Sequence, residues 1–478
     1  MENHVHLTLA TARVSDSAKN TGEFQLSADH VTMSGYRTLH RIEPPENDEA
    51  PPRLPIWRVR FSSCRSYLNH PHSLRLLAAG ASSTIQCFSL ADRTNKDPDS
   101  NNALDASVIC VERTDSLVCK DQCSVARDPL TLGFAALDVA RNYCGADPVA
   151  RNEVVAASQL GGKVCLWCFL DPASIDKGAT MADTATHTDV GNGTERKRLI
   201  QPHVEFSINL ATGTTLAIRP PALENYYSKK ETDILVALGC ANGAVILCKS
   251  GILAARSFEC AGLSSTSSIV GDSSSSSGEP VKILSNSIPG EIVSTTGDGH
   301  ACVMSLAFHP TVPNTLVVGR KDGLIDIYSS ATADQGSFTP RRMHQLVHSS
   351  FPIRALAFSK PHGELLFAGD DGGKLYSYDA SCNINKTQLS APVKLVACAL
   401  NAHKGWVMNL APLSDGKVAT CGSDCSVKVW DCGMGLALST PVHSFSAHDG
   451  LVWGVDCGAD KLVSCGDDGV LEIFSCGE

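Results

Sequence analysis

Apolar and polar positions recur in the same order in two stretches near the end of the chain. Residues 402–431 read AHKGWVMNLAPLSDGKVATCGSDCSVKVWD, and residues 447–474 read AHDGLVWGVDCGADKLVSCGDDGVLEIF. Each stretch begins with Ala-His and continues with three apolar segments, of which the second ends in Gly-x-Asp. Alternating apolar positions indicate β-strands, and Asp or Asn beside Gly is typical of a tight hairpin. The pattern therefore predicts small antiparallel sheets, one for each repeat.

The chain contains seven units of this kind. Each is recognised by a residue in the hairpin turn that is followed, six positions later, by an aromatic or small residue. The pairs are Ser82/Phe88, Gly161/Trp167, Asn242/Cys248, Asp322/Tyr328, Asp424/Trp430 and Asp468/Phe474, with Asp371/Tyr378 one residue longer. We expect the first strand of each unit at 55–61, 134–140, 214–220, 303–308, 352–358, 406–411 and 451–456. Repeated small sheets of this length predict a β-propeller with seven blades.

The repeats resemble WD repeats, because one of them ends in Trp430-Asp431 and both complete ones begin with Ala-His. The resemblance implies an all-β fold, a seven-bladed WD-repeat β-propeller. The last four units are compact, whereas the first three carry long polar insertions near 92–129, 171–202 and 261–299. The third is rich in Ser, and such tracts are too polar to pack. We expect a mobile N-terminal tail at 1–35 and the propeller at 36–478.

Closure of the ring requires an outer strand for the last blade. The last repeat has three strands, the third at 470–474. The segment 36–42, YRTLHRI, precedes the first unit and is our candidate for the missing strand. Truncation past residue 42 is then expected to destabilise the whole ring, because it exposes an unpaired sheet edge.

Several polar residues of the last two repeats resemble parts of a catalytic set. The WD resemblance instead implies that each blade buries a hydrogen-bond chain, which gives such His and Asp residues the partners they need. No nucleophile recurs within reach, so we favour the structural role. The residues of these chains are His403, Thr420, Asp424 and Trp430 in the sixth blade, and His448, Ser464 and Asp468 in the seventh. The adjacent carboxylates Asp370-Asp371 and Asp467-Asp468 lie in predicted hairpin turns, where exposed Asp is ordinary.

Large side chains gather at the start of the innermost strands. Trp57, Met304, Arg354, Met408 and Trp453 each lie two residues before the first packing Leu or Val, and Trp406 lies close by. In a propeller these positions ring one mouth of the central channel. Trp and Arg are enriched at binding hot spots, and Met offers an adaptable apolar surface. We favour a partner-docking face, and the alternative is that these residues only plug the channel.

Composition narrows the classes of function. The 478 residues carry a net charge of −10, which disfavours direct binding of nucleic acid as the main activity. The N-terminal residues show no signal peptide, and the chain has no run of about 18 apolar residues, so we expect no membrane span. Neither a GxxxxGK[ST] nor an HExxH motif occurs, and we expect no cofactor.

The 20 cysteines are scattered along the chain. Cys165, Cys248, Cys302, Cys457 and Cys465 replace small apolar residues in predicted strands, where buried free thiols are expected. The pair Cys165/Cys168 lies in a strand and points to opposite faces, and Cys119/Cys123 lacks further ligands at zinc-site spacing. The sequence therefore predicts no metal site.

Residues 303–478 resemble the WD-repeat subunit family of the superkiller (Ski) complex. The segments that carry the resemblance are VMSLAF, KDGLIDIY, PIRALAF, GDDGGKLYSYD, HKGWVMNLA, SDCSVKVWD, HDGLVWGVD and SCGDDGVLEIFSC, in that order. The resemblance implies a non-enzymatic scaffold that docks a tetratricopeptide-repeat protein in a complex with an RNA helicase, which feeds messenger RNA to the exosome. It also implies membership of the RNA polymerase II-associated factor (Paf) complex in many eukaryotes, and hence cytoplasmic and nuclear locations.

Two other classes remain open. A substrate receptor of a cullin-RING ubiquitin ligase often carries an Arg two residues after the WD Asp, but Cys432-Gly433 follow Asp431 here. An enzyme would need polar groups that converge in the central channel, and the predicted mouth residues are mostly apolar.

Overall fold

The computed structural model consists of β-strands in seven sheets, with no helix among the residues that it describes. The described residues are 36–43, 54–62, 74–93, 108–118, 133–141, 153–160, 163–169, 198–200, 202, 204–207, 213–220, 234–250, 291–293, 301–312, 314–329, 341–381, 393–414, 416–432, 440–458 and 460–476. The predicted tail at 1–35 and the Ser-rich part of the third insertion lie outside them.

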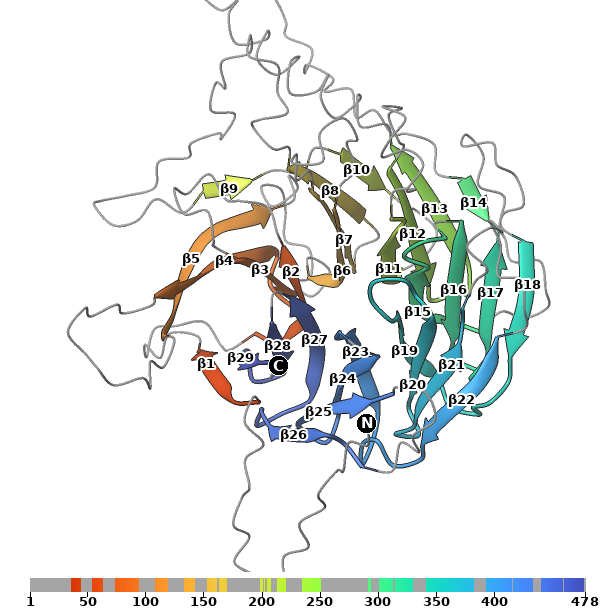
Figure 1. Cartoon of the computed structure of the whole chain (residues 1–478). Helices are drawn as coiled ribbons and strands as arrows, with labels where there is room; N and C mark the ends of the chain where they lie inside the picture. Colours follow the sequence, from red (N-terminus) through yellow and green to blue (C-terminus); the bar gives the residue numbers. More distant parts are fainter. Residues whose placement is uncertain are drawn as a thin grey trace, which may run out of the picture. The chain divides into compact units, whose positions relative to one another are not determined.

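Each sheet is one blade, and the blades follow the chain in order (Figure 1). Blade 1 contains β2 (Ile56–Ser62), β3 (Leu74–Gly80), β4 (Thr84–Arg93), β5 (Val108–Val118) and β9 (Arg198–Ile200). Blade 2 contains β6 (Phe134–Arg141), β7 (Glu153–Gln159), β8 (Lys163–Phe169) and β10 (Val204–Ser207). Blade 3 contains β11 (Gly213–Ile218), β12 (Ile234–Cys240), β13 (Val245–Ser250) and β14 (Glu291–Val293).

The remaining blades have four strands each. Blade 4 contains β15 (Val303–Phe308), β16 (Thr315–Arg320), β17 (Ile325–Ser329) and β18 (Arg341–Leu346). Blade 5 contains β19 (Ile353–Phe358), β20 (Leu365–Asp370), β21 (Leu375–Asp379) and β22 (Lys394–Ala399). Blade 6 contains β23 (Val407–Pro412), β24 (Lys417–Gly422), β25 (Ser426–Asp431) and β26 (His443–Ser446). Blade 7 contains β27 (Val452–Gly458), β28 (Lys461–Gly466), β29 (Leu471–Ser475) and β1 (Thr38–Ile42).

The inner strands form a closed ring around the channel (Figure 1). Each of β2, β6, β11, β15, β19, β23 and β27 contacts the inner strands of both neighbouring blades, and β27 returns to β2. The seven-bladed propeller predicted from the repeats is therefore confirmed, as are the positions of all seven inner strands.

The N-terminal strand closes the ring, as predicted. β1 pairs antiparallel with β29, with Arg41 opposite Glu472 and Ile42 opposite Leu471. Arg41 Nη1 also lies 2.8 Å from the Glu472 carboxylate, which is almost fully buried. Two ends of the chain thus share one sheet, so blade 7 depends on both.

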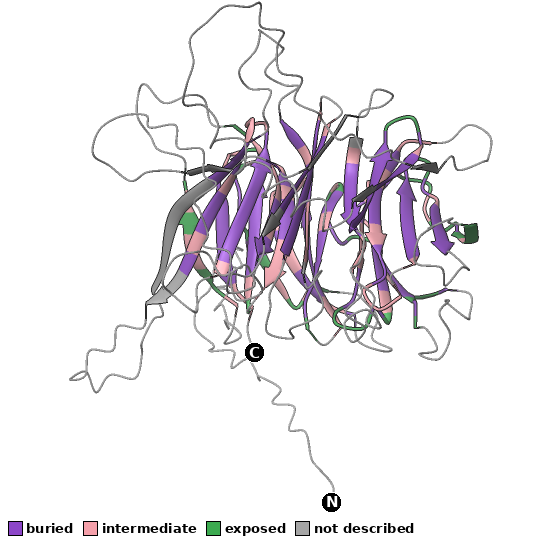
Figure 2. Ribbon diagram, turned by 90° about the horizontal axis from the view of Figure 1, so that it is seen from above, coloured by how far each residue is buried: buried purple, intermediate pink, exposed green. Residues whose placement is uncertain are grey.

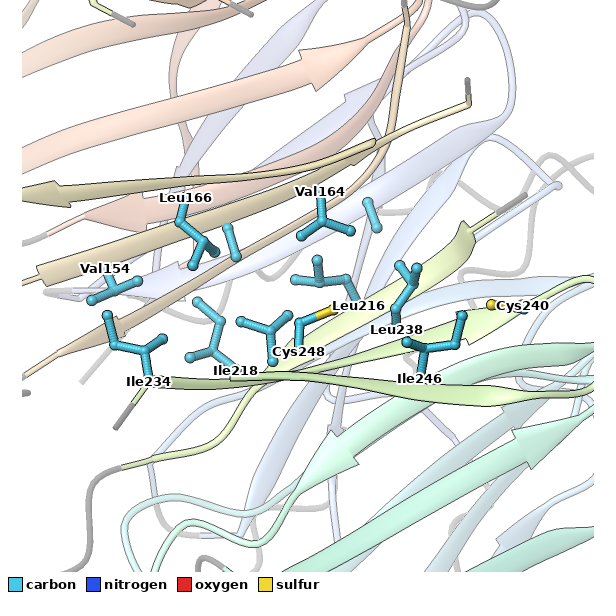
Figure 3. Packing of buried hydrophobic residues seen from close by; sticks show 13 residues of the cluster. Val154, Val164, Leu166, Leu216, Ile218, Ile234, Leu238, Cys240, Ile246 and Cys248 are labelled. Carbon is cyan, nitrogen blue, oxygen red and sulfur yellow. The ribbon is translucent and has the colours of Figure 1, made fainter. Parts of the chain in front are cut away.

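Side chains from adjacent blades fill the space between them. One hydrophobic cluster lies at each of the seven blade interfaces. Figure 3 shows the cluster between blades 2 and 3, where Val154, Val164 and Leu166 face Leu216 and Ile218. Because both faces of a middle strand are covered, β7, β12 and β16 are buried along their whole length. Figure 2 shows how buried residues dominate the strands of the propeller. Such strands read as continuous apolar runs instead of alternating ones.

The limits of the three predicted insertions need correction. β5 lies within 92–129, β9 within 171–202 and β14 within 261–299, so each predicted loop contains a strand at the outside of a blade. β9 was not expected at all, and it adds a fifth, parallel strand to blade 1 beside β5. Outer strands cover only one side of the blade, so their sequences are more polar and resemble loops.

Candidate functional site

One β-bulge recurs at the second residue of every inner strand. The pairing of the inner strand with its neighbour skips one residue in each blade, namely Trp57, Ala135, Thr214, Met304, Arg354, Met408 and Trp453. A bulge re-aims the side chain that it contains and is common at the rims of barrels and next to binding sites. Five of the six predicted docking residues therefore occupy equivalent bulge positions, and Trp406 directly precedes β23.

Arg354 holds the most polar contact of this set. Its Nε and Nη2 atoms donate to Asp371 Oδ1 and Oδ2 at 2.6 and 2.7 Å, which is a two-pronged ion pair. The guanidinium carbon also lies 4.8 Å from the ring centre of Trp406. Both contacts fix the orientation of the guanidinium, since a planar fork on a carboxylate leaves it little freedom.

Two exposed aromatic rings lie beside this ion pair. Trp406 is 43% exposed, and its backbone N–H donates to Ser423 Oγ at 2.8 Å. Phe351 is 45% exposed and packs over the hairpin next to Asp371, where a Cβ added to Gly372 would come within 2.7 Å of its ring. We call Phe351, Arg354, Asp371 and Trp406 the rim patch. In the rim patch, the exposed rings of Phe351 and Trp406 lie beside the ion pair of Arg354 and Asp371.

The sequence reasoning missed Phe351. Its position, two residues before Ile353, lies in the loop that leads into an inner strand, as Trp406 does in the next blade. A large apolar residue in such a loop has no strand face on which to be buried. That signal was present in the sequence and indicated an exposed ring.

The other predicted docking residues are less exposed. Trp57 and Met304 are half-buried, and the ring of Trp57 lies against Gly133 of the next blade. Trp453 is half-buried too, and its Nε1–H donates to Asp467 Oδ1. Met408 needs correction, because it is 2% exposed and belongs to the hydrophobic cluster between blades 6 and 7. It therefore offers no surface to a partner.

Below the mouth, the channel holds charges that the sequence reasoning did not expect. Arg58 and Arg60 of β2 lie close to each other, and Arg60 lies near Asp138 of β6, which in turn lies near Asp456 of β27. Arg60 Nε lies 3.5 Å from Asp138 Oδ1, and the N–H of Phe61 donates to Asp456 Oδ2 at 2.8 Å. The expectation of mostly apolar residues concerned the mouth of the channel, and it did not extend to the positions below the bulges. The signal was the pair of arginines in WRVRF with one Asp at the matching place in each adjoining blade.

Arg58 links the two tryptophans of the first and last blades. Its Nη1 donates to the backbone carbonyl oxygens of Trp57 at 2.9 Å and Trp453 at 3.2 Å. Burial, and then the charge of Arg60, lowers the pKa of Arg58 to about 10, so it stays protonated at neutral pH. Burial raises the pKa of Asp138, although Arg60 and the N–H of Ile218 oppose the rise. The hydrogen bonds and the ion pair described above join these groups to one another and to backbone atoms.

The polar residues of blade 6 form a buried chain of hydrogen bonds. His403 Nδ1 lies 2.8 Å from Asp424 Oδ1, and His403 Nε2 lies 2.7 Å from Thr420 Oγ1. Trp430 Nε1–H donates to the same Thr420 hydroxyl at 3.0 Å. An ionised carboxylate can only accept a hydrogen bond, so Nδ1 carries the proton that faces Asp424. In the neutral imidazole Nε2 then accepts from the Thr420 hydroxyl. Burial lowers the pKa of His403, which agrees with this tautomer.

Blade 7 repeats the chain without the tryptophan. His448 Nδ1 lies 2.9 Å from Asp468 Oδ2, and its Nε2 lies 2.7 Å from Ser464 Oγ. Phe474 occupies the place of the Trp and packs in the cluster between blades 6 and 7. These contacts tie the loop before each inner strand to the hairpin that follows the second strand.

Blade 5 builds a different buried chain, which corrects one expectation about its paired carboxylates. Asp370 is fully buried instead of exposed, and its carboxylate accepts from Ser349 Oγ at 2.7 Å and Tyr376 Oη at 3.0 Å. Asp371 is held by Arg354. Ser349 thus stands where blade 6 has His403, so the same loop and hairpin are joined by other residue types.

No group of three or more His, Cys, Asp or Glu residues within the described part of the chain is arranged to hold a metal ion. Cys165, Cys248 and Cys465 are buried as expected, whereas Cys302 and Cys457 are only half-buried. Cys119 and Cys123 lie outside the described residues. Nor does any helix in the described ranges have the length and apolarity required to cross a membrane.

Comparison with known families and curated proteins gives matches to parts of the chain. The WD40 family model (WD domain, G-beta repeat) matches residues 394–431 and 439–475. Protein TOPLESS of Arabidopsis thaliana is 24% identical over 184 residues, which is 35% of this chain and 15% of that protein. The ribosome biogenesis protein WDR12 homolog of Ixodes scapularis is 34% identical over 83 residues, or 17% of this chain and 19% of that protein. The chain therefore spans less than a fifth of the length of these relatives.

Comparison with solved structures extends the similarity to the whole ring. The β-propeller domain of Myceliophteria thermophila Cps50 (Swd1) aligns with 92% of this chain and 99% of its own, with a TM-score of 0.52 and 12% identity. At that identity the similarity supports the fold alone. The two lines of comparison agree on repeats that form a propeller, a fold that generally serves as a scaffold for protein interactions.

Proposed function

We propose that this protein, whose WD40 repeats and seven-bladed propeller support the WD40 family, is a non-enzymatic scaffold that docks protein partners through the rim patch. The observation that carries the proposal is the fixed guanidinium of Arg354 between a carboxylate and the exposed ring of Trp406. Exposed aromatic and Arg side chains that are already ordered lose little entropy on binding, and they are the residue types that dominate interface energies. Trp57, Trp453 and Met304 border the same mouth and complete the proposed surface.

We further propose that the docked partner is the tetratricopeptide-repeat scaffold of a Ski-type complex, together with its RNA helicase, or else subunits of the Paf complex. The support is the ordered run of four repeats from residue 303 onward, described above. In this proposal the protein acts in cytoplasmic messenger RNA decay and in nuclear transcription elongation, and it contacts no nucleic acid itself.

The rim patch predicts that Arg354→Ala with Trp406→Ala weakens partner binding about 30-fold or more, since truncation of hot-spot residues costs about 2 kcal/mol or more. The measurement is affinity purification of the tagged full chain from its native cells, followed by titration of the partner recovered. The matched control replaces Leu395 and Val396 of β22 by Ala, because these are comparably exposed apolar residues on the outer strand of the same blade.

The outcomes separate the alternatives. Recovery of a Ski-type helicase and its scaffold, lost with the rim variant and kept with the control, supports both parts of the proposal. Paf subunits would place the protein mainly in transcription. Recovery of a cullin adaptor would indicate a substrate receptor of a ubiquitin ligase instead. Equal loss of partner binding in the rim variant and in the control variant would show that the rim patch is not the docking site.

A further inference from the structure

Two cysteines lie in contact where the ring is closed. Cys457 is near the end of β27, and Cys476 directly follows β29. Their sulfur atoms are 3.7 Å apart, and both residues are half-buried at the edge of the cluster between blades 6 and 7. The N–H of Cys476 donates to the carbonyl oxygen of Asp460 at 2.8 Å, which holds the end of the chain beside the β27–β28 turn.

We propose that Cys457 and Cys476 form a thiol–disulfide exchange site, which a low-molecular-weight disulfide such as glutathione disulfide oxidises to an intramolecular disulfide. The two sulfurs are already in van der Waals contact, and side-chain rotation must bring them to a bond of about 2.05 Å. This site is independent of the proposed docking function.

The surroundings give the two thiols different roles. The sulfur–sulfur hydrogen bond with Cys476 lowers the pKa of Cys457, although burial opposes this shift. The ammonium of Lys360 lowers the pKa of Cys457 as well. Lys360 Nζ donates to the Cys457 carbonyl oxygen at 3.3 Å, so its charge is held close. The same sulfur–sulfur hydrogen bond and burial raise the pKa of Cys476. We assign the attacking thiolate to Cys457, because Lys360 holds its ammonium against the backbone of that residue, and the resolving thiol to Cys476.

The exchange balances in two steps. The Cys457 thiolate attacks one sulfur of glutathione disulfide, forms a mixed disulfide and releases one glutathione thiolate, which takes up a proton. Cys476 then loses its proton and attacks the Cys457 sulfur, which releases the second glutathione. The protein loses two hydrogen atoms, and one glutathione disulfide becomes two glutathione molecules.

Oxidation would act on ring closure, because the last strand also pairs with the N-terminal one. The Ser475 N–H donates to the Arg37 carbonyl oxygen at 2.9 Å, and the Arg37 N–H donates to Ser475 Oγ at 3.0 Å. Tyr36 lies close enough to both thiols for their charge to raise its pKa, after burial as the larger cause. A bond from Cys476 to β27 would anchor the end of β29 and with it β1.

The test exposes the reduced full-length protein to glutathione and glutathione disulfide in defined ratios, alkylates the remaining thiols and maps the peptides by mass spectrometry. We expect a cross-linked peptide pair containing residues 457 and 476. With Cys476→Ser we expect a stable glutathione adduct on Cys457, and with Cys457→Ser no fast reaction at Cys476. Hydrogen exchange of Leu471–Ser475 and Thr38–Ile42 should be slower in the oxidised protein.

Cys425 provides the internal control, because it is half-buried and its pKa is raised by burial and by nearby aspartates. At pH 7 Cys457 should react on the order of tenfold faster than Cys425, since rate follows the thiolate fraction. The proposal is overturned if Cys457 reacts no faster than Cys425, or if folded protein in excess glutathione disulfide gives no cross-link between 457 and 476. Adducts that collect on Cys476 would contradict the assigned roles.

Discussion

Removal of residues 1–42 is expected to lower the free energy of unfolding by about 5 kcal/mol relative to removal of residues 1–35 alone. The longer deletion takes away β1, which pairs along β29 and places Leu39 and Ile42 against the cluster between blades 7 and 1. Both side chains are half-buried, so each contributes about 1 kcal/mol, less than a fully buried one, and the ladder adds about 1 kcal/mol for each hydrogen bond. Such a loss is a large fraction of the stability of an ordinary domain. Thermal and denaturant melts of the two truncated proteins measure it.

A peptide that spans residues 36–43 provides the matched test of mechanism. Added to the longer deletion, it should restore the melting temperature, because the open edge of β29 offers the backbone groups that β1 normally pairs. The shorter deletion should not respond to the peptide. Equal melting temperatures for the two truncated proteins would show that β1 does not hold the ring closed.

Asp424→Ala is expected to destabilise the protein by about 3 kcal/mol, since loss of one partner leaves buried polar groups unsatisfied. The Asp424 carboxylate accepts from His403 Nδ1, from the Ser426 hydroxyl at 2.7 Å and from the Lys404 N–H at 3.0 Å. The substitution removes these contacts, together with those from the Ser426 N–H and Lys428 Nζ at 3.3 Å each, and loosens the loop that carries Trp406. Denaturant unfolding of the full chain is the measurement.

Asp322→Ala is the control for this prediction. Asp322 occupies the same hairpin position in blade 4, but it is exposed and accepts from the Leu324 N–H at 3.2 Å. We expect Asp322→Ala to lower the free energy of unfolding by less than about 1 kcal/mol, as substitutions of most exposed side chains do. A similar cost at both positions would mean that the hairpin turn, and not the buried chain, accounts for the effect.

The same chain makes the protein sensitive to acid. Burial opposes ionisation of Asp424, but the hydrogen bonds from His403, Ser426 and Lys404 outweigh it and hold the pKa well below its usual range. Stability from this carboxylate is present above about pH 4 and is lost as the pH falls further. His403 acts in the same direction, because burial lowers its pKa and the unfolded state takes up a proton below about pH 6.5. In Asp424→Ala the loss of stability below pH 4 should therefore be smaller than in the unaltered protein.

Blade number and strand order were determined by the sequence. Period-two alternation and the hairpin residues are local features, so they predicted the seven inner strands and the candidate for ring closure. The outer strands β5, β9 and β14 were read as loops, because a strand that covers one side of a blade needs fewer apolar residues.

Contacts between residues distant in sequence were decided only by the tertiary structure. The same bulge occurs at Arg354 and at Met408, yet Arg354 reaches the rim whereas Met408 is buried in the cluster between blades 6 and 7. The difference arises from the residues that surround each bulge. The charges of the channel come from β2, β6 and β27, which meet only when the ring closes. The contact between Cys457 and Cys476 also depends on the tertiary structure, because the end of β29 packs beside the turn between β27 and β28. Repetition encodes the blades, but it does not encode what each blade meets across its interface, because that depends on side-chain size and charge on two surfaces at once.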